Sequence, residues 1–226
     1  MTNNKTTIGV LGGLGPHTTS VFYLDIIERA TNVSRPSICI YSVPVSLQKE
    51  QSFIENGSDK RYFENLLKAG LTRLEKAGST HVVLPCNTLH EFHDILSAQT
   101  TLKFPNLIKF VSKEIKEREW TEIFLLATSR TLSTKLYQNI LTQEGIKIHT
   151  PSHQDQVLLD QAITTALQVK DTTTHKAFLN KLINKTPCKN IVLGCTDLQL
   201  LLPHGPRTID STRVLADSVV EIIRGN

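Results

Sequence analysis

The sequence predicts an α/β fold of two pseudo-symmetric lobes, each a mostly parallel four-stranded sheet flanked by helices. Apolar runs of strand length alternate with stretches that repeat apolar residues at helical spacing, which is typical of parallel α/β sheets. A similar strand-turn-helix unit also occurs twice, around Cys86 and around Cys195. In addition, Ile8 to Thr19 aligns without gaps with Ile123 to Thr134. The number of residues that separates these two segments is nearly the same as the number that separates Cys86 from Cys195. Together these observations favour a duplicated α/β unit.

The first half is expected to contain four strands, at Thr6 to Gly13, Ser37 to Val43, Val82 to Leu84 and Phe104 to Phe110. The helices expected between them run from a cap at Thr18 or Thr19 to Ala30, from Tyr62 to Ala77, from Leu89 to Ser97 and from Val111 to Glu119. Gln48 to Lys60 is polar and reads as a loop or a short helix.

In the second half, strands are expected at Glu122 to Ala127, Ile146 to His149, Ile191 to Leu193 and Thr208 to Asp210. Helices are expected at Leu132 to Gln143, Gln154 to Val169, His175 to Asn184 and Arg213 to Arg224. Open α/β sheets bind ligands at the carboxyl ends of their strands. The two cysteines are therefore expected to meet at a shared crevice between the lobes.

Composition limits the classes of function. The net charge of +4 is modest and the basic residues are scattered, so no nucleic-acid or membrane partner is expected. No apolar segment approaches the roughly 20 residues that a membrane-spanning helix needs. The start of the chain does not resemble a signal peptide. Four cysteines without paired spacing indicate reduced thiols in a cytoplasmic protein.

Each repeated unit places a cysteine between a strand and a helix. The two units read Val-Val-Leu-Pro-Cys-Asn-Thr-Leu, from Val82, and Ile-Val-Leu-Gly-Cys-Thr-Asp-Leu, from Ile191. Backbone N–H groups and the helix dipole at such a position are expected to lower the pKa of a thiol below its ordinary value of about 8.5. The alternative for either thiol is a small buried hydrophobe, which is the interpretation we favour for Cys39 and Cys188.

Two other motifs have alternative interpretations. Gly12-Gly13-Leu14-Gly15 could suggest a dinucleotide loop, but its spacing differs from Gly-x-Gly-x-x-Gly and no acidic residue ends the next strand. A tight turn that brings backbone near a small substrate fits better. Cys86, His90 and His93 fall at helical spacing and could suggest a metal site, but we expect no metal. His17 is expected to be an exposed surface histidine.

Three motifs in this order resemble the aspartate/glutamate racemase superfamily, most closely its aspartate racemase group: Ile8 to Pro16, Pro85 to His90 and Leu193 to Asp197. The resemblance covers nearly the whole chain. It implies an isomerase that works without a cofactor, usually as a homodimer, on a small amino-acid substrate. It also implies that the final helix returns to the first lobe. We therefore expect an N-terminal lobe of residues 1–105 plus 208–226 with Cys86, and a second lobe of residues 106–207 with Cys195.

The resemblance also assigns roles to residues. Cys86 and Cys195 would be the two catalytic bases, and Asn87, Thr88 and Thr196 would bind the substrate α-carboxylate, largely through backbone N–H groups. Thr128, Ser129 and Thr131 match the family's Gly-Thr-x-x-Thr turn in part, with Ala127 where glycine is usual. The remaining residues expected to contact the substrate are Gly13, Leu14, Lys49, Gln51 and Lys170.

One departure from the family concerns specificity. Archaeal aspartate racemases carry an arginine after the second strand that is thought to read the side-chain carboxylate, and Pro44 to Gln51 contains none. Lys49 could replace that charge, and Lys170 is the nearest match to a lysine of similar role. Aspartate or glutamate is the substrate that the resemblance implies, with a broad-specificity amino-acid racemase as the alternative. A related lyase or isomerase and a non-catalytic binding module on the same scaffold also remain open.

The chemistry fits two cysteines. Inverting a stereocentre by proton transfer needs a base on one face of the α-carbon and an acid on the other, and a thiolate facing a thiol meets this need. We expect the two sulfur atoms about 7 to 9 Å apart, so that both reach one α-carbon from opposite sides. The sequence thus predicts a cofactor-independent racemase that uses two thiols.

Overall fold

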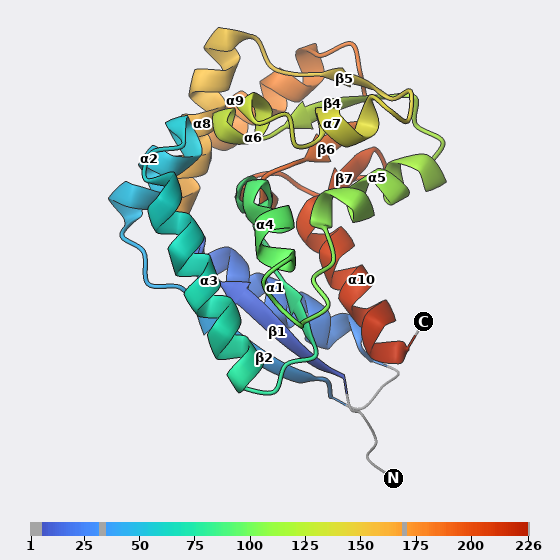
Figure 1. Cartoon of the computed structure of the whole chain (residues 1–226). Helices are drawn as coiled ribbons and strands as arrows, with labels where there is room; N and C mark the ends of the chain where they lie inside the picture. The colour runs from blue at the N-terminus through green and yellow to red at the C-terminus, as the bar shows by residue number, and fades with distance from the viewer. Residues whose placement is uncertain (1–5, 32–34, 169–170, 226) are drawn as a thin grey trace.

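The computed structural model describes residues 6–31, 35–168 and 171–225, which form two parallel sheets with helices around them (Figure 1). The first sheet has the strand order β2-β1-β3 and the second the order β5-β4-β6-β7. The strands are β1 (Thr7–Gly12), β2 (Ser37–Ser42), β3 (His81–Val83), β4 (Glu122–Leu126), β5 (Lys147–His149), β6 (Ile191–Leu193) and β7 (Thr208–Asp210).

Helices connect the parallel strands, as this topology requires. Those of the first half are α1 (Pro16–Arg29), α2 (Leu47–Asn56), α3 (Lys60–Lys76), the 3₁₀ helix η1 (Thr88–Phe92), α4 (His93–Ser97) and α5 (Leu107–Glu117). Those of the second half are α6 (Ser129–Ser133), α7 (Gln138–Leu141), α8 (His153–Leu167), α9 (Thr173–Lys185), the 3₁₀ helix η2 (Thr196–Leu200) and α10 (Ser211–Arg224).

The two sheets share one arrangement. In each, the first strand of its half (β1 or β4) lies between the strand that follows it and the strand that leads to a cysteine, β3 or β6. The predicted α/β class with two similar lobes is confirmed. The first sheet nevertheless has three strands within the described residues, because Phe104 to Phe110 is not a strand. Asn106 accepts hydrogen bonds from the backbone N–H groups of Ile108 and Lys109 and so begins α5 inside that range.

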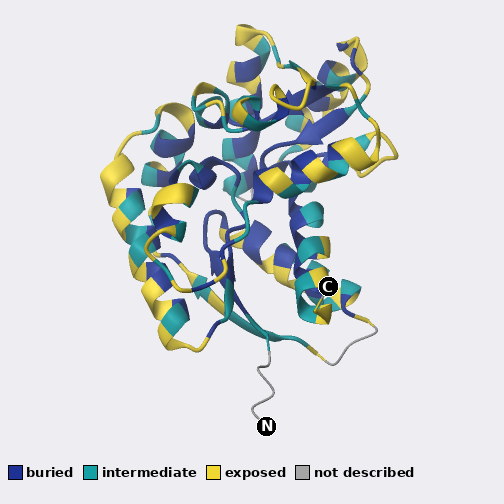
Figure 2. Cartoon of the chain, turned by 45° about the vertical axis from the view of Figure 1, so that its right-hand side comes forward, coloured by how far each residue is buried: buried dark blue, intermediate teal, exposed yellow. Residues whose placement is uncertain are grey.

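Successive strand residues face different parts of the core. Ile8, Val10, Ile123 and Leu125 belong to one apolar cluster that joins both sheets through α1, α5 and α10. The next strand residues face the other way. Leu11 packs in a second apolar cluster with α3. Phe124 and Leu126 of β4 pack in a third cluster with residues of β6, α8 and α9. Dark buried segments therefore run through both lobes in Figure 2. This two-sided burial explains the continuous apolar runs of the strands.

The chain closes across the two lobes. β7 pairs with β6, so Thr208–Asp210 belongs to the second sheet, and the boundary expected at residue 208 falls too early. α10 follows directly and packs against α1 and α5 (Figure 1). The last helix thus returns to α1 and α5 of the first half, and it also contacts η2 of the second.

Several local predictions need correction. α1 begins at Pro16, with Gly15 rather than Thr18 or Thr19 at its N-cap, because proline suits the first helical position. For the polar stretch from Gln48 onward, the short helix is the alternative that the structure confirms: it is α2, capped by Ser46. The helix expected from Leu132 to Gln143 is two short helices, separated where Lys135 has a φ of 56°.

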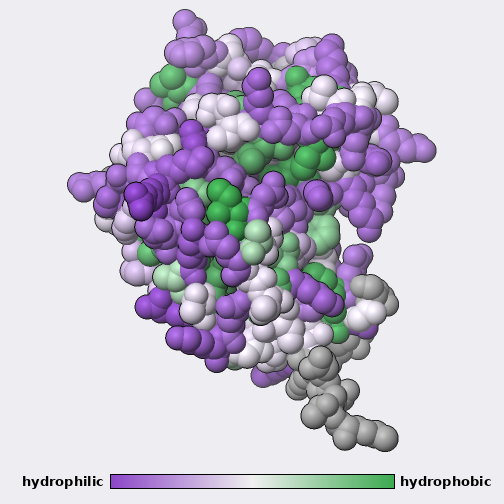
Figure 3. Space-filling model, in the orientation of Figure 1, coloured by the Kyte–Doolittle hydropathy of each residue, from purple (hydrophilic) through white to green (hydrophobic). Residues whose placement is uncertain are grey.

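The outer surface is mostly polar. The face drawn in Figure 3 is largely hydrophilic, with smaller apolar areas near its centre. No helix within the described ranges combines the length and the apolar character that crossing a bilayer would need.

Candidate active site

Both cysteines follow strands that have equivalent places in their sheets. Cys86 lies three residues beyond the end of β3, and Cys195 lies two residues beyond the end of β6. Gly194 lets the segment before the second thiol pack closely on β4 of its own lobe, because a Cβ there would lie 2.7 Å from Cδ1 of Leu125. A charge on Cys86 raises the pKa of Cys195, so the two thiols are close enough to interact electrostatically. The structure therefore brings the two predicted residues into one site.

Neither thiol has the lowered pKa that the sequence led us to expect. Desolvation raises the pKa of Cys86 to about 12, although the backbone N–H groups of Leu89 and Thr88 oppose this increase. Burial likewise raises the pKa of Cys195 well above its ordinary value, and the charge of Asp197 adds to the increase. Each thiol is followed by a five-residue 3₁₀ helix, which provides local N–H groups but no long helix dipole. Both cysteines are thus protonated in the free protein at neutral pH.

Asp197 is a buried carboxylate beside the second thiol. The Cys195 thiol donates to its Oδ2 over 3.9 Å, and the Thr18 hydroxyl donates to its Oδ1. Thr18 comes from α1 of the first half, so this contact links the two halves. Burial raises the pKa of Asp197, and the charge of nearby His17 partly offsets that effect. The carboxylate lies where it can exchange a proton with Cys195.

Glu50 is a second buried acid near the thiols. It lies in the first turn of α2 and is 7% exposed. Burial and then the charge of Asp197 raise its pKa to about 8. A charge on Glu50 in turn raises the pKa of Cys86. Two acids of separate elements therefore lie close enough to the thiols to affect their pKa values.

Three threonine hydroxyls form a hydrogen-bonded triangle between the halves. The Oγ1 atom of Thr88 lies 3.0 Å from Oγ1 of Thr128 and 3.0 Å from Oγ1 of Thr131. Thr128 and Thr131 are themselves 3.0 Å apart, and Thr128 also caps α6 by accepting from the backbone N–H of Thr131. All three are buried. The structure thus groups three of the residues that the resemblance assigned to substrate binding.

Asn87 holds the first cysteine unit against the second half through its side chain. Its Oδ1 accepts from the Tyr137 hydroxyl at 2.6 Å, and its Nδ2 donates to Ser211 at 2.8 Å. Burial raises the pKa of Tyr137, which therefore remains a donor at all ordinary pH values. Because both ends of the amide are engaged, only the backbone of Asn87 is available to a ligand.

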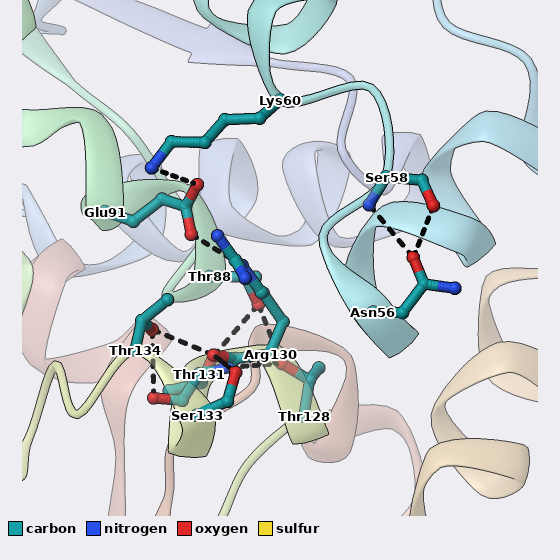
Figure 4. A network of polar contacts seen from close by, with 10 residues as sticks. All are labelled: Asn56, Ser58, Lys60, Thr88, Glu91, Thr128, Arg130, Thr131, Ser133 and Thr134. Atoms are coloured by element: carbon teal, nitrogen blue, oxygen red, sulfur yellow. Dashed lines mark hydrogen bonds and ion pairs between the residues drawn. The ribbon is translucent and has the colours of Figure 1, made fainter.

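A buried ion pair ties the same unit to the loop after β4 (Figure 4). Arg130 donates from Nε to Glu91 at 2.7 Å, and the side chain of Glu91 is only 4% exposed. The more exposed Lys60 approaches the other oxygen of Glu91 at 3.7 Å. The contact fixes η1 relative to α6, close to the threonine triangle that Figure 4 also draws.

The other predicted contact residues are distributed unevenly. Gly13 has a φ of 95°, where a side chain would collide with Val43, and its N–H is bonded to Thr19 at 2.9 Å. Leu14 is buried in the core of the first lobe. Thr196 is buried directly after Cys195, whereas Ser129 is engaged by Asp160, which accepts from its backbone N–H at 3.0 Å and from its hydroxyl.

The expected reader of a side-chain carboxylate, Lys49, does not have that arrangement. Its ammonium pairs with Asp59 at 2.5 Å and lies 4.6 Å from the ring centre of Tyr62, on the exposed side of α2. Gln51, two residues on, is half-buried. The inward residue of this turn is Glu50, which has the opposite charge. Lys170 lies outside the described residues.

The histidines that suggested a metal site have structural roles. His90 Nδ1 lies 2.8 Å from the carbonyl oxygen of Cys86, and its Nε2 accepts from the backbone N–H of Leu107 at 3.1 Å. Burial lowers its pKa to about 4, consistent with this neutral form. His93 contacts the carbonyl of Phe104 at 2.9 Å. Across the described part of the chain, no three His, Cys, Asp or Glu side chains are grouped to hold a metal ion.

Three functional candidates were missed by the sequence reasoning. Asp197 stands inside a quoted motif, two residues after Cys195, and Glu50 stands between two residues that were selected. Both acids could therefore have been selected from the sequence, because each stands within two positions of a residue that was predicted to belong to the site. Nothing in the sequence points to Tyr137, because its contact with Asn87 joins segments 50 residues apart.

These features define a two-lobed α/β protein with a cysteine at the carboxyl end of the equivalent strand in each lobe. The family model described as Asp/Glu/Hydantoin racemase matches residues 11–219, and the chain belongs to this family of isomerases. A curated relative, the broad specificity amino-acid racemase RacX of Bacillus subtilis, is 26% identical over 225 residues, which cover 94% of this chain and 96% of the relative.

Solved structures agree on the fold. Aspartate racemase from Picrophilus torridus superposes with a TM-score of 0.82 at 22% identity, covering 97% of this chain and 94% of that one. Glutamate racemase from Campylobacter jejuni superposes with a TM-score of 0.69 at 19% identity, covering 97% and 85% of the two chains. At these identities the likeness establishes the architecture, and the substrate has to be argued from the site.

Proposed function

We propose that this protein racemises an α-amino acid by moving the α-proton between Cys86 and Cys195. The observation that carries the proposal is the placement of two thiols at equivalent strand ends of two similar sheets. Proton transfer on both faces of one carbon needs such a pair, because a single base returns the proton to the face it came from.

Because both thiols are protonated in the free protein, one must lose its proton before it can act. Asp197 is the acceptor that the hydrogen bond from Cys195 supports. Once Asp197 holds that proton, the Cys195 thiolate removes the α-proton while the Cys86 thiol donates its own proton to the opposite face. Cys195 is then a thiol and Cys86 a thiolate, which is the state that accepts the other enantiomer.

The substrate's own charges would assist this transfer. Its α-ammonium would lie near the two thiols, where its positive charge lowers their raised pKa values. Its α-carboxylate would accept from the backbone N–H groups after each cysteine, at Asn87, Thr88 and Thr196. Negative charge builds up on that carboxylate as the α-proton leaves, so these fixed donors stabilise the transition state more than the ground state.

The test is isotope exchange without added cofactor. Single L-amino acids are incubated with the protein in deuterated water, and Cα deuteration and enantiomer composition are followed by NMR and chiral chromatography. We expect deuterium to enter together with inversion, and treatment with a chelator or with hydroxylamine to leave the rate unchanged. Cys39→Ala, which changes a cysteine of β2, is the matched control and should retain the rate. Binding without exchange would instead favour a non-catalytic binding module.

Two further parts of the proposal concern the substrate and the assembly. A broad amino-acid specificity fits this chain better than aspartate or glutamate alone, because the two carboxyl side chains near the thiols, Glu50 and Asp197, would repel a second carboxylate. The similarity to a relative named a broad specificity amino-acid racemase supports the same view. A homodimer remains the expected assembly, and sedimentation velocity measures it directly.

A further inference from the structure

The first turn of α2 directs one acid inward and one base outward. Ser46 caps the helix by accepting from the backbone N–H of Lys49 at 3.4 Å. Lys49 then pairs with Asp59 at the surface, and Glu50 points into the protein, where it is 7% exposed. Within the described ranges, no hydrogen bond or ion pair engages the carboxylate of Glu50. A carboxyl group that is nearly buried and has no protein partner among the described residues is available to a ligand.

Glu50 lines a cavity of about 430 Å³ next to Gly12 to Gly15, the glycine loop that follows β1. The other walls are mostly apolar and come from the glycine loop, the segment after β2 and the end of α8. They include Pro16, Val43, Pro44, Val45, Leu47 and Leu167. The cavity thus offers an open groove with apolar side chains and a carboxyl group in its wall, which suits a chain of methylene groups ending in a polar head.

The electrostatic contacts place this carboxylate near the reacting thiols. Glu50 interacts with Cys86, and Asp197 interacts with both Glu50 and Cys86. Asp197 is already engaged by Thr18 and Cys195, which leaves Glu50 as the acid that faces the cavity. A second carboxylate brought in by an aspartate or glutamate side chain would add to this repulsion, whereas a cation would relieve it.

We propose that Glu50 determines the substrate class of this racemase by pairing with a cationic side chain, so that lysine and ornithine are preferred to aspartate and glutamate. This inference rests on the proposed function of the same site. The methylene groups of such a substrate would lie along Val43, Val45 and Leu167, with the terminal amino group at the carboxylate. The high pKa of Glu50 supports the assignment, since a cation is the partner that restores its ionised form.

The experiment compares the wild type with Glu50→Gln on lysine, alanine and aspartate. The values of kcat/KM come from Cα deuterium exchange, and Kd values come from calorimetry, which needs no turnover. For Glu50→Gln we expect both measures to worsen about tenfold or more for lysine, to change less than about threefold for alanine and to improve for aspartate. Glu55→Gln, an exposed acid of the same helix, should behave as the wild type.

Three outcomes would overturn the assignment. The first is a wild-type protein that binds aspartate as tightly as lysine. The second is an equal loss for all three substrates, which would mean that Glu50 serves the α-ammonium that every amino acid carries. The third is a Glu50→Gln protein with unchanged affinity for lysine. Absence of exchange in the wild type with every amino acid would refute the racemase proposal instead, and calorimetry would still decide the role of Glu50.

Discussion

The two cysteine units have the same topology but differ in the residue two positions after the thiol. In the first unit this residue is Thr88, whose hydroxyl joins Thr128 and Thr131 in the second half. In the second unit it is Asp197, whose carboxylate accepts from Thr18 in the first half. Each unit therefore reaches across to the loop region after the first strand of the other lobe. A duplicated fold positions both thiols, and one substitution gives only one of them an adjacent acid.

The units also differ in how they are anchored. The first is held by neutral His90, which ties the Cys86 loop to the start of α5, and by the buried Glu91. In the second, the five residues of η2 include one ionisable side chain, Asp197. Ionisable side chains thus anchor the first cysteine unit, whereas the ionisable side chain of η2, Asp197, lies beside the Cys195 thiol. The predictions below test this division between structure and chemistry.

The largest stability effect is expected at the anchor of the first unit. Arg130→Met leaves the buried Glu91 without its close partner, which should lower the free energy of unfolding by about 3 kcal/mol or more. Lys60→Met removes the distant, exposed partner and should cost less than about 1 kcal/mol. Urea denaturation measures both, and equal losses would show that the 2.7 Å contact has no special weight.

Asp197→Asn should separate chemistry from thiol protonation. We expect racemisation to fall about 100-fold, because the proton acceptor for Cys195 is lost. Removing the same charge lowers the pKa of both thiols, so alkylation of Cys86 and Cys195 by iodoacetamide at pH 8 should become faster. Peptide mapping by mass spectrometry reports each site, with exposed Asp94→Asn as the control. Slower alkylation together with lower activity would contradict this account.

The neutral state of His90 predicts a pH dependence of stability. Burial lowers its pKa from an ordinary 6.5 to about 4, so the unfolded chain binds a proton that the folded protein refuses between these values. The stabilisation is complete above pH 6.5 and is lost as the pH falls towards 4, by about 2 to 3 kcal/mol. His90→Gln should flatten this part of the curve, whereas exposed His153→Gln should not. Denaturant unfolding at several pH values measures the difference.

Glu50 gives an effect of opposite sign. Its raised pKa means that the folded protein binds an extra proton between the ordinary value of 4.5 and about 8, so stability falls as the pH rises through that window. Glu50→Gln removes a buried charge and should raise the free energy of unfolding at pH 9 by about 3 kcal/mol or more. The gain should vanish at pH 5. A destabilised variant at pH 9 would mean that the charge has a stabilising partner.

Local sequence patterns were sufficient to predict the strands that carry the thiols, because apolar runs ending in Pro85-Cys86 and Gly194-Cys195 leave few other readings. They failed at Phe104 to Phe110, where the apolar run predicted a strand but the N-cap at Asn106 begins a helix. They also failed for the thiol pKa values, since desolvation depends on what packs around a residue in three dimensions. The inward position of Glu50 was missed for the same reason, since charge can be read from a sequence but the inward face of a short polar helix cannot.

The most direct test of the central claim uses Cys86→Ala and Cys195→Ala with both enantiomers of the best substrate in deuterated water. Each variant keeps one thiol on one face of the α-carbon, so it should lose racemisation yet still exchange the α-proton of one enantiomer. The account predicts that the two variants retain exchange of opposite enantiomers. Retention of the same enantiomer by both, or racemisation by either, would contradict the pairing of Cys86 with Cys195.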